Sequence, residues 1–566
     1  MSNTNLSAWA LKHQQFILFS IIILLIGGIY SYTHLGQEED PGFTVRSMVV
    51  QAYWPGATLE QMQEQVTDKL EKKLQSVAEI DYVKSFVEAG QTQLTVTLRD
   101  DTPPDEVPEV WYQVRKKIGD IAYSLPQGVR GPFFNDEFGT TFGNIYALTA
   151  DGFNYAQMKV FAESARDEFL RVPNVDQVNL VGTQDQRIYI EYSNAKLSTL
   201  GINPDQIVAT LKTVNGVEPA GVIQTRDEQI QLNVSGDFDS VQSIRNIGIY
   251  ANGHMFRLGD VATVKRGYVD PPQLRMFFNG QPAIGLAISM RTGGDVLHLG
   301  KDLNAAAARL ESNFPVGVKL NTVSDQPKVV KTAVGEFSDS LYEAVGIVLL
   351  VCFLSLGIRT GFVVALCIPF VLAVVFLVMY LLGIDLQRIS LGALIIALGL
   401  LVDDAIIAVE MMVRKMEEGY DKVRAATFAY DVTAMPMLTG TLITAAGFLP
   451  IGLAKSTVGE YTFAIFAVTV ISLLLSWVVS VYFVPYLGNI LLKPKPVSSE
   501  HHEHFDTPFY RRFRATVDWC VAHRWLTIAA TIGIFALGIV GMGKVQQQFF
   551  PDSSRPEIMV DIWFPE

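Results

Sequence analysis

Two adjacent aspartates, Asp403 and Asp404, lie near the middle of the apolar run LGALIIALGLLVDDAIIAVEMMV at residues 391–413. A carboxylate at mid-bilayer depth costs roughly 2.5 to 3.5 kcal/mol on insertion scales, and acids inside membranes usually mark proton or ion pathways. Burial and a neighbouring like charge both disfavour the ionised form, so the pair is predicted to take up protons reversibly as one coupled unit. The alternative is a structural pair that bonds to a neighbouring helix and keeps one protonation state.

Other polar features carry weaker signals. Gly399, about one helical turn before the acids, is predicted to allow close helix packing beside them. Glu410 and Arg414 have the spacing of an ion pair at the helix end. The run HHEH at residues 501–504 is predicted to be solvated rather than to bind a metal. No nucleophile, base and orienting group converge in a recognisable motif, so an enzyme is not expected.

The apolar runs predict seven membrane helices, because a ~30 Å hydrocarbon core needs about 20 residues. They lie at residues 14–33, 341–358, 361–384, 391–413, 432–454, 461–492 and 525–543. No small-residue cleavage site follows the first run, which is therefore predicted to stay as a membrane helix rather than leave as a signal peptide. The connections on one side carry twelve Lys and Arg residues, and the short connections on the other carry two, Arg388 and Lys455. This bias predicts a cytoplasmic N-terminus.

The composition fits a membrane protein with a large water-exposed part, since hydrophobic residues make up 49% and charged residues 18% of 566 positions. The formal net charge of -13 argues against a nucleic-acid partner, because binding phosphates needs a basic face. The three cysteines show no metal or redox spacing and are predicted to be buried apolar residues.

The chain contains an internal repeat, in which residues 1–56 align without gaps to residues 511–566. The identical positions are Trp9/Trp519, His13/His523, Ile22/Ile532, Gly28/Gly538, Ile29/Ile539, Gln37/Gln547, Pro41/Pro551, Val50/Val560 and Pro55/Pro565. Six helices separate the copies, so both copies run in the same direction, as in the parallel repeats of some transporters. The chain is predicted to end just inside the second copy of a protein with about twelve membrane helices.

The long segment between the first two helices has the pattern of two α+β units. Strand, helix, hairpin and helix follow in the first unit, and Thr58 with Gln61 predicts a capping box at its first helix. A second unit begins at GNIYALTADG and is predicted to resume at QPAIGLAISM. Residues 183–270 between these parts are predicted to form an inserted subdomain.

Four segments resemble the hydrophobe/amphiphile efflux branch of the resistance-nodulation-division superfamily. They are FFNGQPAIGLAISMRTGGDVL, GLLVDDAIIAVE, AAGFLPIGLAKSTVGEYTFAIF and VPYLGNILLKP. The resemblance implies an α-helical transmembrane bundle with large periplasmic α+β (ferredoxin-like βαβ) porter subdomains and an inserted docking subdomain. Seven helices of that bundle lie in this chain.

The resemblance also divides the chain. It implies helix one at 1–37, a first porter subdomain at 38–132, a second at 133–182 and 271–330, a docking insertion at 183–270, helices two to six at 331–492, a cytoplasmic linker with an amphipathic helix at 493–524, helix seven at 525–543 and the start of a second periplasmic repeat at 544–566. It places the family's proton-relay aspartates on Asp403 and Asp404 and implies a lysine counter-ion in the second half. It implies substrate contacts at Phe138, Phe142, Val181 and Phe277, although Val181 stands where multidrug members often carry phenylalanine.

The predicted function is proton-driven export of amphiphilic or hydrophobic small molecules from the periplasm or outer leaflet by a protein of the bacterial inner membrane. The proton gradient supplies the energy and no cofactor is expected. The implied partners are a periplasmic adaptor, an outer-membrane channel, membrane lipid and further copies in a homotrimer, for which the docking insertion carries only a short interlocking arm. Two alternatives stay open: a heavy-metal exporter of the same superfamily and a non-exporting translocation or lipid-handling relative.

Overall fold

The computed structural model describes residues 5–137, 139–216, 219–226, 228–233, 238–251, 253–291, 293–493, 508–545 and 560–562. Within these residues, seven helices are long and apolar enough to cross a membrane. They are α2 (Gln14–His34), α12 (Gln326–Leu356), α13 (Ile358–Leu382), α14 (Arg388–Glu417), α15 (Lys422–Gly452), α16 (Thr457–Leu491) and α18 (Arg524–Met542). The seven predicted spans are confirmed. Helix α12 differs most from its predicted range of 341–358. It begins at Gln326, well before the apolar run, and directly follows a strand.

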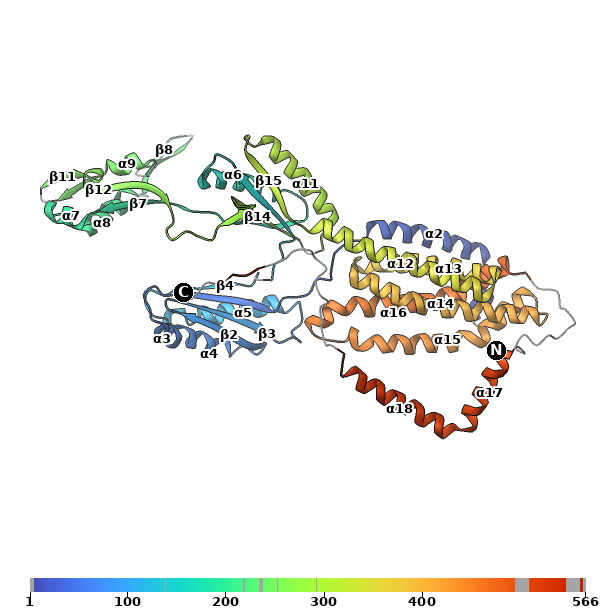
Figure 1. Cartoon of the computed structure of the whole chain (residues 1–566). Helices are drawn as coiled ribbons and strands as arrows, with labels where there is room; N and C mark the ends of the chain where they lie inside the picture. The colour runs from blue at the N-terminus through green and yellow to red at the C-terminus, as the bar shows by residue number, and fades with distance from the viewer. Residues whose placement is uncertain are drawn as a thin grey trace. The chain divides into compact units, whose positions relative to one another are not determined.

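Helices α2 and α12–α16 pack into one bundle (Figure 1), and the short α1 (Leu6–Lys12) packs against α15 and α16. Asp421 and Ser456 accept hydrogen bonds from first-turn N–H groups and so start α15 and α16. Helix α2 lies very close to α13, since a Cβ at Gly28 would lie 2.3 Å from the carbonyl oxygen of Ala373. Only glycine permits this approach without a shift of one helix.

The first α+β unit has a four-stranded sheet in the order β2-β3-β1-β4. Its strands are β1 (Ser47–Tyr53), β2 (Ile80–Glu88), β3 (Gln91–Leu98) and β4 (Arg130–Asn135). Its helices are α3 (Leu59–Met62), a π-helical turn (Gln63–Thr67), α4 (Asp68–Leu74) and α5 (Val107–Gly119), which share one apolar core with the sheet. The capping box of Thr58 and Gln61 is present, and the predicted order of elements is confirmed.

Strand β4 belongs to this first sheet. It pairs with β1, with Phe134 opposite Val50 and Phe133 opposite Gln51. The predicted boundary at residue 133 therefore falls inside a strand, and the correct break between the units follows β4. Pairing between distant strands decides this limit, and a local sequence pattern does not show such pairing.

The second α+β unit has a five-stranded sheet built from two separate parts of the chain, in which β14 pairs with β13, β5 and β6 and β5 pairs with β15. The strands are β5 (Asn144–Ala150), β6 (Val175–Val181), β13 (Met276–Phe278), β14 (Gln281–Met290) and β15 (Val318–Asp325). Helices α6 (Tyr155–Phe169) and α11 (Val296–Asn313) pack on the sheet. The unit resumes at β13, a few residues before the predicted Gln281, which is the first residue of β14.

The insertion between β6 and β13 has an apolar core of its own. Its elements are β7 (Gln186–Tyr192), α7 (Asn194–Leu200), α8 (Pro204–Val214), β8 (Pro219–Gln224), β9 (Gln229–Asn233), α9 (Val241–Arg245), β10 (Gly248–Ala251), β11 (His254–Arg257), α10 (Leu258–Val261) and β12 (Ala262–Tyr268). All of them lie within the predicted limits of 183–270.

The linker between α2 and β1, residues 35–46, is bonded to three membrane helices. The Glu39 carboxylate pairs with Arg388 of α14 at 3.0 Å and accepts a hydrogen bond from Gln326 of α12 at 2.7 Å. Farther along the linker, Arg46 forms an ion pair with Glu460 of α16. The chain leaving α2 is thus bonded to the ends of α12, α14 and α16 before it enters the first sheet.

Helices α17 (Pro508–Ala522) and α18 belong to a second unit of the chain. The break between these helices repeats the break between α1 and α2. His523 stacks on Trp519 with ring centroids 5.0 Å apart, and His13 stacks on Trp9 at 4.6 Å. Each histidine Nδ1 also lies within hydrogen-bond distance of the carbonyl of its tryptophan. The sequence repeat therefore corresponds to a repeated local structure.

Candidate functional site

Asp403 and Asp404 lie on adjacent positions of α14 and border the same cavity, which has a volume of about 390 Å³. Asp404 is 8% exposed, whereas Asp403 is open to the cavity side of the helix. The remaining lining residues come mostly from α14 and α15: Leu400, Ile407, Val432, Thr433, Pro436, Met437, Gly440, Thr441, Thr444 and Leu473. Of the two acids, Asp404 is buried in the bundle and Asp403 is exposed on the open side of the cavity.

The shape of α15 helps to make this cavity. Pro436 lies inside the helix and has no N–H to bond the carbonyl of Val432, which also borders the cavity. Gly440, one turn later, has no side chain to fill the space. Together these residues leave a polar opening beside the acids in an otherwise apolar bundle.

Hydroxyl groups hold the buried acid. The Thr441 hydroxyl lies 3.4 Å from Oδ2 of Asp404 and 2.9 Å from the Met437 carbonyl, and its single proton can be donated to either oxygen. Ser476 of α16 also hydrogen bonds Asp404, and its hydroxyl donates to the carbonyl of Leu401 at 2.7 Å. A carboxylate held by hydroxyls can be charged or protonated, because a hydroxyl either donates to it or accepts from it. This is the property that a reversible proton site needs.

Gly399 does not make a close contact in the described part of the chain. A Cβ at this position would meet no heavy atom within 4 Å, so the packing seen here does not need glycine at residue 399. The predicted pair of Glu410 with Arg414 is wrong: Arg414 approaches Glu418 instead, at 3.8 Å. Glu410 and Glu418 each lie four residues from Arg414, and the ion pair forms with Glu418, which lies toward the end of the helix.

The four predicted substrate positions are spread over the second sheet. Val181 ends β6 opposite Gly285 and is 48% exposed. Phe277 lies in β13 opposite Pro282 and is 55% exposed. Val181 and Phe277 therefore lie near the same half of β14.

Phe142 precedes β5, whose first residue Asn144 faces Ile288, and so lies toward the opposite end of β14. Phe138 lies outside the described residues. The described part of the sheet thus brings two of the four positions near one another, and their role in binding stays a prediction.

In the described ranges, no group of three or more His, Cys, Asp and Glu side chains is arranged to hold a metal ion. The HHEH run at 501–504 lies outside those ranges.

The hydroxyls around Asp404 were not anticipated from the sequence. A signal for them exists: the buried hydroxyl residues of α16 recur every three or four positions, on one helix face, at Thr469, Ser472, Ser476 and Ser480. Serine and threonine are common in membrane helices, so their spacing indicates a face but does not say what it contacts.

The fold and the site define a class: a multi-pass membrane protein with a large extramembrane α+β domain and a pair of acids inside its helix bundle. A family model described as the AcrB/AcrD/AcrF family matches residues 6–566. The chain belongs to this family of resistance-nodulation-division efflux transporters, and it is a transporter protein rather than an enzyme.

Its similarity to individual relatives extends over most of the chain. It is 26% identical over 548 residues to multidrug resistance protein MdtC of Serratia proteamaculans, covering 95% of this chain and 53% of the relative. It is 27% identical over 572 residues to multidrug export protein AcrF of Escherichia coli K12, covering 96% and 54%. Multidrug resistance protein MdtF of Escherichia coli O6:H1 is 26% identical over 524 residues, covering 89% and 49%. The chain thus spans about half the length of the curated relatives that it matches.

Proposed function

We propose that the chain is part of an inner-membrane, proton-coupled antiporter that exports amphiphilic or hydrophobic small molecules. The observation that carries this proposal is the acid pair. Asp403 and Asp404 border an open cavity between α14 and α15, and the hydroxyls of Thr441 and Ser476 hydrogen bond Asp404. Acids at membrane depth are functional by default.

The proton cycle uses the pair as one site. Uptake of a proton from the outer side neutralises one carboxylate of the pair. The free-energy cost of burying that charge then disappears, so conformations that close the acids off from water become accessible. Release to the inner side restores the charge. A transporter switches between two arrangements when each arrangement favours one protonation state of such a site.

The linker at residues 35–46 gives a physical route from the acids to the α+β units. Helix α14 carries both acids and begins at Arg388, which pairs with Glu39 of the linker. Helix α16 contacts Asp404 through Ser476 and begins near Glu460, which pairs with Arg46. A movement of either helix at the acids therefore pulls on the chain that enters the first sheet.

The names of the relatives support the substrate class, since MdtC, AcrF and MdtF are multidrug resistance or export proteins. We propose that Phe142, Val181 and Phe277 contribute to substrate contacts, and that a basic residue beyond the described part completes the relay. A homotrimer working with a periplasmic adaptor and an outer-membrane channel belongs to the same proposal.

The experiment measures ethidium accumulation in cells that lack their own efflux pumps. Cells that express the protein are expected to retain less ethidium, and Asp403→Asn is expected to raise retention to the level of cells without it. Glu410→Gln, which changes another acid of the same helix, is the matched control and should pump normally. Efflux by the Asp403→Asn variant at the normal rate would contradict the proposal, and an effect on metal tolerance alone would favour a metal exporter.

A further inference from the structure

A face of buried hydroxyls runs along α16. Thr469, Ser472, Ser476 and Ser480 are each 2% exposed or less. Ser476 donates to Leu401, but the hydroxyls of Thr469, Ser472 and Ser480 have no hydrogen-bond partner within the described part of the chain. A buried hydroxyl without a partner is unfavourable, and buried water is the usual partner when the surroundings leave room for it.

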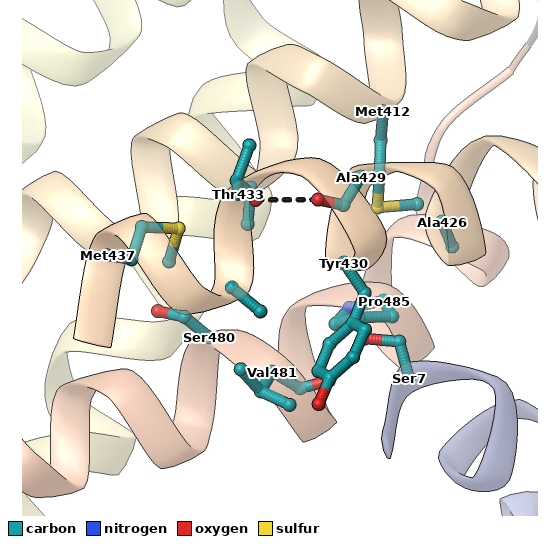
Figure 2. A pocket seen from close by; sticks show the side chains of 12 residues that line it. Ser7, Met412, Ala426, Ala429, Tyr430, Thr433, Met437, Ser480, Val481 and Pro485 are labelled. Carbon is teal, nitrogen blue, oxygen red and sulfur yellow. Dashed lines mark hydrogen bonds between the residues drawn. The ribbon is translucent and has the colours of Figure 1, made fainter. Parts of the chain in front are cut away.

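Ser480 is the one of these three that borders small cavities. One cavity of about 10 Å³ lies between α1, α14, α15 and α16, and Figure 2 shows the Ser480 hydroxyl directed toward Met437 within it. A second cavity of the same size, on the other side of Ser480, is bordered by Ser476 and Leu401. A volume of about 10 to 15 Å³ holds one water molecule.

The first cavity has polar groups to bind that water. Besides Ser480, three hydroxyl residues border it: Ser7, Tyr430 and Thr433. Tyr430 lies beside Ser7 at the α1 end of the cavity (Figure 2). The other lining residues are mainly alanine and methionine, so the hydroxyls are its main polar side-chain groups. A buried water needs two to four polar partners. The hydroxyls of Ser7 and Thr433 donate to the carbonyls of Val481 and Ala429, so each can still accept a hydrogen bond from the water. Ser480 can donate to the water or accept from it.

The position of the cavity connects the acid pair to the inner side. Thr433 and Met437 border both this cavity and the larger cavity of Asp403 and Asp404. Met412 lies on α14 beyond the acids, toward the helix end that precedes the basic inner connection. By the distribution of Lys and Arg, that end faces the cytoplasm.

We propose that Ser480 binds a water molecule in this cavity and that this water forms the inner arm of the proton path. The inference rests on the proposed proton-coupled function and adds its route. Asp404 releases its proton to water in the larger cavity, and the O–H electron pair stays on the carboxylate. Water passing Thr433 and Met437 carries the proton to the water held by Ser480. That water gains this proton and gives one of its own protons to solvent water on the cytoplasmic side, so no net charge stays in the cavity. Thr433 and Met437 form the narrow point between the two cavities.

The test reconstitutes the protein in liposomes with trapped pyranine and follows proton flux when ethidium is added under an imposed pH gradient. Ser480→Ala is expected to slow ethidium-dependent proton flux by about tenfold or more. This is less than the roughly 10²- to 10⁴-fold contributed by a group that itself transfers the proton, because Ser480 holds the water. Ser480→Thr, which restores a hydroxyl, is expected to recover most of the flux. Ser472→Ala removes an equally buried, unpartnered hydroxyl that does not border these cavities, and is expected to match wild type.

The outcomes separate the inference from the proposed function. Equal flux in Ser480→Ala and wild type, with Asp404→Asn inactive, would overturn the inner arm and leave the acid pair in place. Equal loss in Ser480→Ala and Ser472→Ala would also overturn it, because the effect would then come from packing of α16. Absence of proton flux from wild type, with ethidium still transported, would overturn both claims.

Discussion

Arg46, at the end of the linker that leads into the first sheet, forms a buried ion pair with Glu460 at the start of α16. Arg46 is only 5% exposed on its side chain, and its guanidinium also donates twice to the carbonyl of Thr102. Glu460 accepts in addition from the backbone N–H of Thr44 at 2.8 Å. The Arg46 guanidinium thus connects helix α16 to the first α+β unit by hydrogen bonds and an ion pair.

Removing Arg46 leaves the Glu460 carboxylate, which is 22% exposed, without its ion-pair partner. The loss of stability is expected to be smaller than the roughly 3 to 5 kcal/mol of a fully buried pair. Arg46→Met is therefore expected to lower the thermal midpoint clearly, and Arg46→Met with Glu460→Leu to recover a large part of the loss. Arg99→Met is the control, because it breaks the solvent-exposed pair with Asp101, which is expected to contribute little to stability. Thermal unfolding midpoints measured in detergent test this prediction. Similar shifts of the midpoint for Arg46→Met and Arg99→Met would contradict a stabilising role of the Arg46–Glu460 pair.

The half-buried Glu38 carboxyl is expected to make the stability of the fold depend on pH. Burial and then the nearby Asp385 carboxylate raise the pKa of Glu38 to about 7, from 4.5. Because the folded-state pKa is the higher one, the contribution of Glu38 to stability is complete below pH 4.5 and is lost as the pH rises through about 7.

Glu38→Gln is expected to remove this pH dependence. The variant should be no more stable than wild type at pH 4.5 and more stable at pH 8, because it cannot ionise beside Asp385. Thermal unfolding across this pH range is the measurement, with Glu60→Gln, an exposed glutamate of α3, as control. A difference between Glu38→Gln and wild type that stays constant with pH would exclude the raised pKa.

Alanine substitutions at Gly28 and Gly399 are expected to have opposite effects on thermal stability. A Cβ at Gly28 would press on the Ala373 backbone, whereas a Cβ at Gly399 meets nothing within 4 Å in the described structure. Gly28→Ala is expected to loosen α2 from α13 and lower the thermal midpoint. Gly399→Ala is expected to be neutral or slightly stabilising, because alanine favours a helix by about 1 kcal/mol over glycine. If Gly399→Ala proves the more harmful variant, the second half of the transporter packs against residue 399.

Thr441 and Thr444 offer a matched pair at the acid cavity. Both border it, and each hydroxyl lies within hydrogen-bond distance of the carbonyl four residues earlier, but of the two only Thr441 also lies within hydrogen-bond distance of Asp404. Thr441→Val is expected to reduce ethidium export several-fold, because Asp404 loses a hydroxyl that positions it. Thr444→Val keeps the shape and should export normally. Initial efflux rates at equal expression test this, and equal rates for the two variants would remove Thr441 from the site.

The sequence predicted the membrane helices well because an apolar run of sufficient length has few other uses. It also predicted the repeat and the interruption of the second α+β unit. It did not predict the early start of α12, because residues before Leu341 are too polar to read as a membrane helix. The place of β4 and the pairing of Arg46 with Glu460 depend on contacts between segments far apart in the chain, which local pattern does not contain.

The acid pair was evident from sequence because charge in an apolar run stands out. Its hydroxyl partners were not, since Thr441 and Ser476 look like ordinary membrane-helix residues until α15 and α16 are placed beside α14. The same holds for Ser480, whose missing partner is visible only once the surrounding cavities are known. Positions on one helix are predictable, whereas contacts between helices require the fold.

The central claim is that Asp403 and Asp404 couple proton movement to export. Its most direct test is ethidium-dependent proton flux in liposomes, compared between wild type and the double variant Asp403→Asn with Asp404→Asn. Wild type is expected to move protons only when ethidium is present, and the double variant to bind ethidium with unchanged affinity but to move no protons. Proton flux in the double variant at the wild-type rate would contradict the claim.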